Sequence, residues 1–297
     1  MSWRTVARKD FQDSIRSRRL LVFVSAFMSV LGLLVFAIVW FEPLILGEQL
    51  TTRQYTGVIL VLLGGFFEFV PSPLAQLLPF IGLLLGYKAV VVERETGQLK
   101  FLLGLPNSRF DVMIGKLVGR SGVGLAAATV SFVLAVLLIV LVGGNGLAVV
   151  PFAVFALLTA LFIVAHIAIG LGFSAIVRSN RQATGVLVLF VAVFQILWQP
   201  FFLGLRVFAF NRSPPNWALF IQSLSPVNAY TNAVRAFVIQ PLEGALRGIG
   251  GGFFAQVSQQ PPEQFFLADW LGLVILFGWT VILPLVGYAV FRRSDIA

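Results

Sequence analysis

Cysteine is absent from the 297 residues of this sequence, and histidine occurs only once. The first absence excludes disulfides, thiol nucleophiles and metal sites built on cysteine. With one histidine and three methionines, the chain also has too few imidazole or thioether ligands for a transition-metal site. No Ser, His and Asp set and no pair of carboxylates indicates a catalytic centre, so we expect no catalytic, cofactor-binding or metal-binding residue in this chain.

Charged residues are also scarce. They make up 11% of the sequence and hydrophobic residues 59%, whereas a typical soluble domain is about 25% charged. This composition excludes a soluble enzyme, a disordered chain and a coiled coil, and it leaves an integral membrane protein. The net charge of +9 then indicates topology rather than nucleic-acid binding.

Six segments are long and apolar enough to cross the bilayer as helices, which takes about 20 residues each. The sequence thus predicts an all-α membrane protein that forms a single transmembrane domain over residues 1–297. A further apolar run, Gly57 to Val70, is too short to span and contains Glu68, so we expect an interfacial or re-entrant helix there. The predicted spans are Leu20 to Phe41, Pro73 to Val92, Ser121 to Val142, Pro151 to Val177, Ala183 to Leu205 and Trp270 to Phe291.

The distribution of Lys and Arg predicts the orientation. Sixteen of the 21 lie before the first span, between spans 2 and 3, between spans 4 and 5, or after the last span. Only five lie in the segments on the other side. Because cytoplasmic segments carry the excess of Lys and Arg, both termini should be cytoplasmic in a multi-pass protein of the plasma membrane.

The spans contain almost no ionisable group, which disfavours a carrier driven by an ion gradient. His166 is the only ionisable group near the middle of a span, and in such a helix it more often forms an interhelical hydrogen bond than carries protons. A nucleotide site is not predicted either. Gly115-Lys116 is followed by Leu117, where a phosphate-binding loop needs Ser or Thr for magnesium. The energy source should therefore lie on another protein.

Two non-spanning regions of this domain carry further information. In residues 1–19, Trp3, Ala7, Phe11 and Ile15 recur every four residues among basic side chains, which predicts an amphipathic helix on the inner leaflet of the bilayer. A frayed basic tail is the alternative. Residues 205–269 form the largest predicted external region.

The most informative segment is the cytoplasmic loop at residues 93–120. Gly97 should break the helix that descends from span 2, and Pro106 should end a short helix whose apolar face includes Leu99 and Leu102. Asn107 or Ser108 can cap the next helix. A short helix with an apolar face suits a groove on a partner protein, although a loop folded onto the inner leaflet remains the alternative.

This loop resembles that of the ABC-2-type transporter permeases, and it is most similar to the branch that contains the permease of the copper-maturation system for nitrous oxide reductase. The N-terminal helix and the Ser225-Pro226 segment resemble the corresponding parts of that family. The loop positions that match the family pattern are Glu93, Glu95, Gly97, Leu102, Leu103, Pro106, Ser108, Arg109, Gly115 and Lys116.

The resemblance implies a permease that pairs with a separate cytoplasmic ABC ATPase and with a second permease copy or a paralogue. ATP and magnesium would bind to the ATPase. The N-terminal helix would be an elbow helix, the loop a coupling helix between spans 2 and 3, and Arg178 and Arg181 a second contact. The residues expected to dock on the ATPase are Glu93, Glu95, Gly97, Leu99, Leu102, Leu103, Pro106, Ser108 and Arg109.

We therefore expect the membrane subunit of an ABC transporter, acting as an exporter. The alternatives are a membrane scaffold that anchors a soluble partner without transport and, less favoured, an ion-coupled carrier. The chain has almost no copper ligands, so the resemblance does not extend to copper as the cargo.

Overall fold

The computed structural model describes residues 3–15, 50–64, 73–104, 108–143, 147–246 and 265–293, with short pieces between residues 22 and 37. Within these ranges every regular element is helical and no strand occurs, which confirms the all-α prediction. The α-helices are α1 (Trp3–Ile15), α3 (Thr52–Gly64), α4 (Pro73–Gly86), α5 (Val91–Glu95), α6 (Gln98–Gly104), α7 (Arg109–Gly143), α8 (Val149–Ile176), α9 (Asn180–Val191), α10 (Trp198–Gly204), α11 (Asn216–Ser223), α12 (Pro226–Val234), α13 (Glu243–Leu246) and α14 (Leu271–Arg293). Three π-helical segments, Ala192–Leu197, Leu205–Ala209 and Arg235–Ile239, and two 3₁₀ turns, Gln240–Leu242 and Phe265–Leu267, complete the set.

Five helical stretches are long and apolar enough to cross a membrane. They are Leu74–Glu95, Arg109–Leu141, Val149–Ile176, Asn180–Ala209 and Leu271–Arg293. They correspond to five of the six predicted spans. The first predicted span, residues 20–41, lies largely outside the described residues, so the count of six stays a prediction. In α3, the 13 described residues reach about 20 Å at 1.5 Å per residue, and residues 65–70 of the predicted interfacial or re-entrant helix lie outside the described residues.

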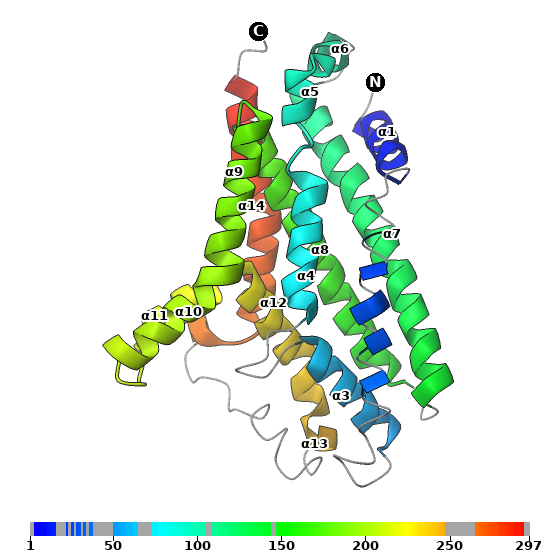
Figure 1. Ribbon diagram of the computed structural model, residues 1–297, viewed down its shortest axis with the longest axis vertical. Coiled ribbons are helices and arrows are strands. Elements are labelled where there is room, and N and C mark those ends of the chain that lie inside the picture. The colour runs from blue at the N-terminus through cyan, green and yellow to red at the C-terminus, as the bar shows by residue number, and fades with distance from the viewer. Residues whose placement is uncertain are drawn as a thin grey trace.

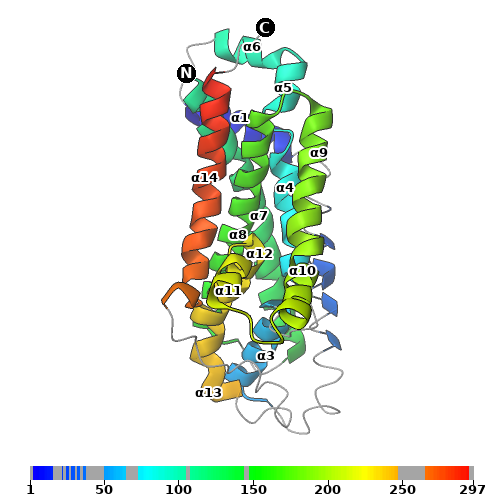
Figure 2. The same cartoon turned by 90° about the vertical axis from the view of Figure 1, so that its left-hand side faces the viewer.

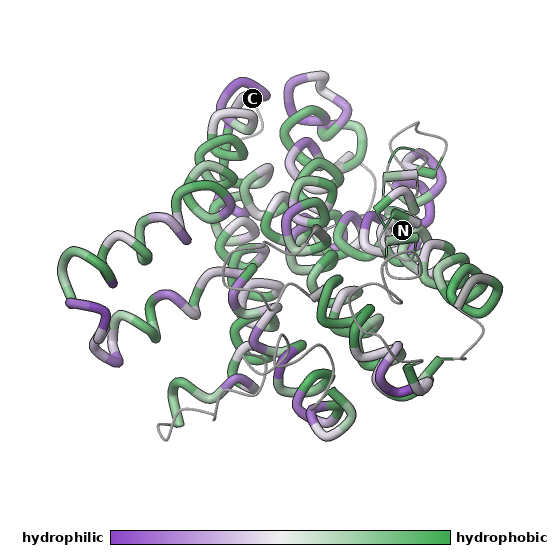
Figure 3. The backbone as a smooth tube through the Cα atoms, turned by 60° about the horizontal axis from the view of Figure 1, so that its bottom comes forward, coloured by the Kyte–Doolittle hydropathy of each residue, from purple (hydrophilic) through white to green (hydrophobic). Residues whose placement is uncertain are grey.

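The long helix α8 lies at the centre of the bundle, between α4, α7 and α14 (Figure 1). Close approach of the backbones depends on glycine. A Cβ atom at Gly82 of α4 would lie 2.6 Å from the Cβ of His166, and one at Gly172 of α8 would lie 2.6 Å from the carbonyl oxygen of Leu283 in α14. Along the long helices the residues are mostly hydrophobic, and hydrophilic residues gather near turns and helix ends (Figure 3).

One end of the bundle carries α1, α5, α6 and the last turn of α14 (Figures 1 and 2); we call it the α6 end. The first turns of α7 also lie at this end, because that helix begins at Arg109, twelve residues before the predicted start of its span at Ser121. Helices α3 and α13 lie at the opposite end (Figure 1).

Helix α1 does not place its predicted apolar stripe on one lipid-facing side. It packs along α7, where a Cβ at Gly119 would lie 2.6 Å from the carbonyl oxygen of Ala7. Ala7 is buried in this contact, and Phe11 packs over Gly122. Trp3 and Ile15, the other two members of the stripe, are 38% and 40% exposed. The stripe is therefore divided between the protein and the surroundings of the bundle.

The region expected to be external, 205–269, is only partly outside the bundle. Helices α10 and α11 form a hairpin that projects sideways, whereas α12 returns into the bundle between α8 and α14 (Figure 1). Seven residues of α12 are buried, among them Tyr230, whose hydroxyl lies 2.9 Å from the Thr159 hydroxyl of α8. The indole of Trp279, two turns into α14, donates a hydrogen bond of 2.9 Å to the carbonyl oxygen of Leu224. The Ser225-Pro226 segment therefore lies at the depth of a candidate span. Residues 247–264 of this region lie outside the described ranges.

Candidate functional site at the α6 end of the bundle

The segment between α4 and α7 forms two short helices, α5 and α6, which we call the α5–α6 segment. A side chain of α8 binds the start of its first helix, α5. The buried hydroxyl of Ser174 accepts hydrogen bonds from the backbone N–H groups of Val90, at 2.9 Å, and Val91, at 3.1 Å. Backbone donors at a helix start have no partner within the helix, so Ser174 fixes where α5 begins.

The predicted break at Gly97 is confirmed. Gly97 lies between α5 and α6 with a φ angle of +73°. Residues with a β-carbon are strained in this left-handed conformation, and glycine is not. The turn redirects the chain so that α6 lies across the tip of the α6 end (Figure 2).

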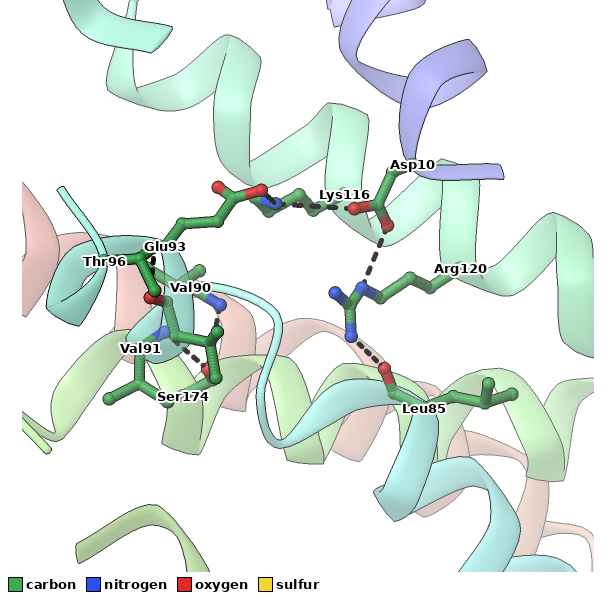
Figure 4. Close-up of polar contacts among 10 residues, drawn as sticks. Asp10, Leu85, Val90, Val91, Glu93, Thr96, Lys116, Arg120 and Ser174 are labelled. Carbon is green, nitrogen blue, oxygen red and sulfur yellow. Dashed lines mark hydrogen bonds and ion pairs between the residues drawn. The ribbon is translucent and has the colours of Figure 1, made fainter. Parts of the chain in front are cut away.

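A cluster of four charges, two of them buried and two partly buried, holds the base of the segment (Figure 4). The ammonium of Lys116 in α7 lies 2.7 Å from the carboxylate of Glu93 in α5 and 3.4 Å from that of Asp10 in α1. The other oxygen of Asp10 accepts a hydrogen bond of 2.9 Å from Arg120, and Arg120 also donates to the carbonyl of Leu85 at the end of α4. Two carboxylates thus balance two cations, which is the condition under which charges are tolerated away from water.

Two further charged residues of the segment bind the ends of other helices. Arg94 donates hydrogen bonds of 2.8 and 3.3 Å to the carbonyl oxygens of Val177 and Ala175 at the end of α8. Glu95 accepts one of 2.8 Å from the backbone N–H of Asn180 at the start of α9. In each case the charge has the sign that the helix end favours, because free carbonyl groups attract cations and free N–H groups attract anions.

Arg109, at the start of α7, makes the same kind of contact with the last turn of α14. It donates hydrogen bonds of 2.6 and 2.8 Å to the carbonyl oxygens of Phe291 and Arg292. Ser108 caps α7 as predicted, because its hydroxyl accepts from the N–H of Asp111 at 3.0 Å while its own N–H donates to the Asp111 carboxylate at 3.1 Å. Asn107, the alternative cap, lies outside the described residues.

The apolar side of α6 faces the bundle rather than a partner. Leu99 is fully buried among Val112, Met113, Ala175 and Phe291, and Leu102 packs partly against the same cluster. The prediction that Leu99 belongs to a docking surface is therefore wrong, because the ends of α7, α8 and α14 already supply an apolar seat for it. The side chain of Leu103 and residues 105–107, which include Pro106, lie outside the described part of the chain.

Phe101 is an exposed apolar residue of α6, and sequence reasoning missed it. Its side chain is 81% exposed, on the side of the helix away from Leu99. Its spacing from Leu99 could have indicated this exposure. Two residues correspond to just over half a turn at 3.6 residues per turn, so Phe101 lies on the opposite side of the helix from the buried leucine. Arg178 and Arg181, in and just after the turn between α8 and α9, are also exposed.

His166 forms its described hydrogen bond within its own helix, not between helices as predicted. Its Nδ1 donates to the carbonyl oxygen of Phe162 at 2.9 Å, and its ring packs edge-on against the Phe162 ring. Among the described residues, no group of three His, Asp or Glu side chains has the geometry to hold a metal ion.

The sequence matches the profile of one protein family and is similar to two permeases over nearly its whole length. The sequence profile of the ABC-2 family transporter proteins matches residues 4–296. A probable ABC transporter permease protein, NosY of Stutzerimonas stutzeri, is 29% identical, with 97% of each chain covered. The corresponding probable permease of Pseudomonas aeruginosa is also 29% identical, with 98% of each chain covered.

Proposed function

Because this chain belongs to the ABC-2 family of transporter proteins and is a membrane permease subunit of an ABC transporter, we propose that a separate ABC ATPase drives it and that it exports its substrate. The ATPase binds ATP and magnesium and carries out hydrolysis, and the permease provides the path through the plasma membrane. Two permease subunits, identical or paralogous, assemble with two ATPase subunits.

The α6 end faces the cytoplasm in this proposal, so both termini are cytoplasmic and α1 is the elbow helix. The support is the distribution of Lys and Arg, which follows the positive-inside rule. Side chains of both signs at this end are engaged with helix ends or with each other, as for Arg94, Glu95 and Lys116. The side chains of Arg178 and Arg181 are exposed, and they offer a second contact to the ATPase.

Phe101 is the observation on which the docking role of α6 rests. A phenyl ring that is exposed in the middle of a helix, whose other side is seated in the bundle, is a typical anchor for a groove on a partner. The revised docking surface consists of Phe101, Lys100 and the α8–α9 turn. Glu93, Glu95, Leu99, Ser108 and Arg109 instead hold the docking helix in place.

This anchoring suggests how docking could drive transport. The α5–α6 segment is bonded to the ends of α8 and α9 and to α7, and α7 is bonded through Arg109 to the end of α14. Closure of two ATPases on ATP would therefore displace these helix ends together, in the rigid-body manner that is common in switching proteins.

The experiment is affinity purification of the tagged full-length permease from its native membranes, followed by measurement of ATP hydrolysis. The expected result is a co-purified soluble-type subunit whose hydrolysis is sensitive to vanadate. A permease that carries a partner without ATPase activity would contradict the proposal and favour a scaffold. Transport into vesicles that follows an ion gradient without ATP would favour a carrier.

A further inference from the structure

We propose that Lys116 is a positioning residue that couples the α5–α6 segment to α1, so that the docking helix and the N-terminal helix move as one unit. This inference rests on the proposed docking of an ATPase at α6. It adds a defined route by which a displacement of α6 reaches α1.

The route consists of three ion pairs. Lys116 is 1% exposed and joins Glu93 of α5 to Asp10 of α1, at 2.7 and 3.4 Å. Asp10 is joined in turn to Arg120, one turn further along α7. Figure 4 shows Glu93, Lys116 and Asp10 following one another from α5 across α7 to α1, and Arg120 joining Asp10 back to α7. These ion pairs thus fix the positions of α5 and α1, which are far apart in the sequence, relative to α7.

The backbone of α5 cannot shift without disturbing this line. Its first two N–H groups are bound to Ser174, and Glu93 follows within the same turn. On the other side, α1 lies against glycines of α7, where a Cβ at Gly115 would lie 2.6 Å from the Cβ of Val6. Such a tight contact leaves α1 little room to slide relative to α7.

Stability alone is a weak reason for such a cluster. A buried ion pair often contributes no more stability than apolar residues of the same volume, and its best-attested use is to specify one arrangement. Glu93 and Lys116 can therefore be replaced together by uncharged side chains of similar size, and Asp10 keeps its pair with Arg120. This double replacement separates a positioning role from a purely structural one.

The test uses the full permease with its co-purified ATPase. The double variant Glu93→Gln, Lys116→Met is compared with the wild type and with Lys9→Met, which removes an exposed lysine of α1 next to Asp10. ATPase stoichiometry and thermal unfolding establish folding and docking. The expected result is normal docking in all three, with transport-coupled hydrolysis reduced about tenfold in the double variant only, within the usual range of coupling between sites.

A distance measurement gives a readout that a structural role would not change. Cysteines at Arg8 and Thr96, both exposed, carry spin labels on α1 and on the loop after α5 in a chain with no native cysteine. In the wild-type background the distance between labels should be the same with and without trapped ATP. In the double variant it should change when ATP is trapped.

Two results would overturn the inference: a distance that changes with ATP in the wild-type background, or a double variant with wild-type coupling and an unchanged distance. Both leave the proposed function standing, since the ATPase is bound and active. A wild-type permease with no ATPase bound would contradict the proposed function itself, and this inference with it.

Discussion

Leu99 and Phe101 are two residues apart on α6, yet Leu99 is fully buried in the bundle and Phe101 is 81% exposed. The helix is therefore seated by one side and free on the other. Leu99 holds the helix in place, and Phe101 presents a surface to a partner. The sequence pattern alone does not distinguish these two roles.

Removal of the Leu99 side chain should affect the fold rather than the docking surface. Leu99→Ala leaves a cavity among Val112, Met113 and Phe291, and such changes cost about 2–5 kcal/mol of stability. Thermal unfolding in detergent should show this loss, while the variant that stays folded still binds the ATPase. A variant with wild-type stability that has lost the ATPase would show that Leu99 faces the partner after all.

The contact between α1 and α7 should not tolerate a single added methyl group at Gly119. The new Cβ would lie 2.6 Å from the carbonyl oxygen of Ala7, a backbone atom that cannot rotate away. We expect Gly119→Ala to lower stability by about 1–3 kcal/mol, as overpacking does.

Gly185→Ala in α9 is the matched control, because nothing lies within 4 Å of its added Cβ. It should raise stability by about 0.5–1 kcal/mol, the usual helix preference for alanine over glycine. Equal stability of the two variants in thermal unfolding would argue against the tight α1–α7 contact.

Asp269, just before α14, should make stability depend on pH. Burial raises the pKa of its carboxyl above the ordinary value of 3.8, and Arg235 offsets part of this rise. The folded state therefore binds the proton more tightly than the unfolded state, so stability falls as pH increases from 3.8 through the raised pKa.

Asp269→Asn removes this titration and keeps an oxygen that can accept from the Gln240 amide, which lies 3.3 Å from the carboxylate. The variant should be more stable than the wild type at neutral pH, and the difference should shrink as pH falls through the raised pKa of Asp269 towards 3.8. Unfolding temperatures measured for both proteins across this range check the prediction. A difference that grows on acidification would have the wrong sign.

The orientation can be tested with single cysteines, since the chain has none of its own. Thr96 lies exposed beside α6, and Ser213 lies exposed in the hairpin between α10 and α11. A membrane-impermeant maleimide added to intact cells should label Ser213→Cys and not Thr96→Cys, and permeabilisation should make both reactive. Labelling of Thr96→Cys in intact cells would reverse the proposed topology.

The sequence predicts those features that local chemistry determines. Length and apolarity identify five of the long helices, glycine marks the break at Gly97, and a hydroxyl marks the start of α7 at Ser108. These signals need no knowledge of the neighbouring helices, and the structure confirms them.

The features that sequence reasoning missed depend on which neighbour an apolar side chain meets. In a membrane protein, an apolar stripe can face lipid, another helix or a partner, and all three look alike in a hydropathy pattern. Ala7, Leu99 and the residues of α12 were therefore assigned to the wrong surroundings. The pairs of Lys116 were hidden for a related reason, because Asp10 and Glu93 come from segments that only the tertiary fold brings together.

Docking of the ATPase on Phe101 is the central claim, and its binding to a Phe101→Asp permease is the most direct test. A carboxylate buried without a partner in an apolar groove costs several kcal/mol, so affinity should fall by orders of magnitude. Phe208→Asp is the control, since Phe208 is 90% exposed in the projecting α10–α11 hairpin, away from the α6 end. The account predicts that the purified Phe101→Asp permease retains its fold and loses the ATPase, while Phe208→Asp keeps it. A Phe101→Asp permease that holds the ATPase at wild-type stoichiometry would contradict the account.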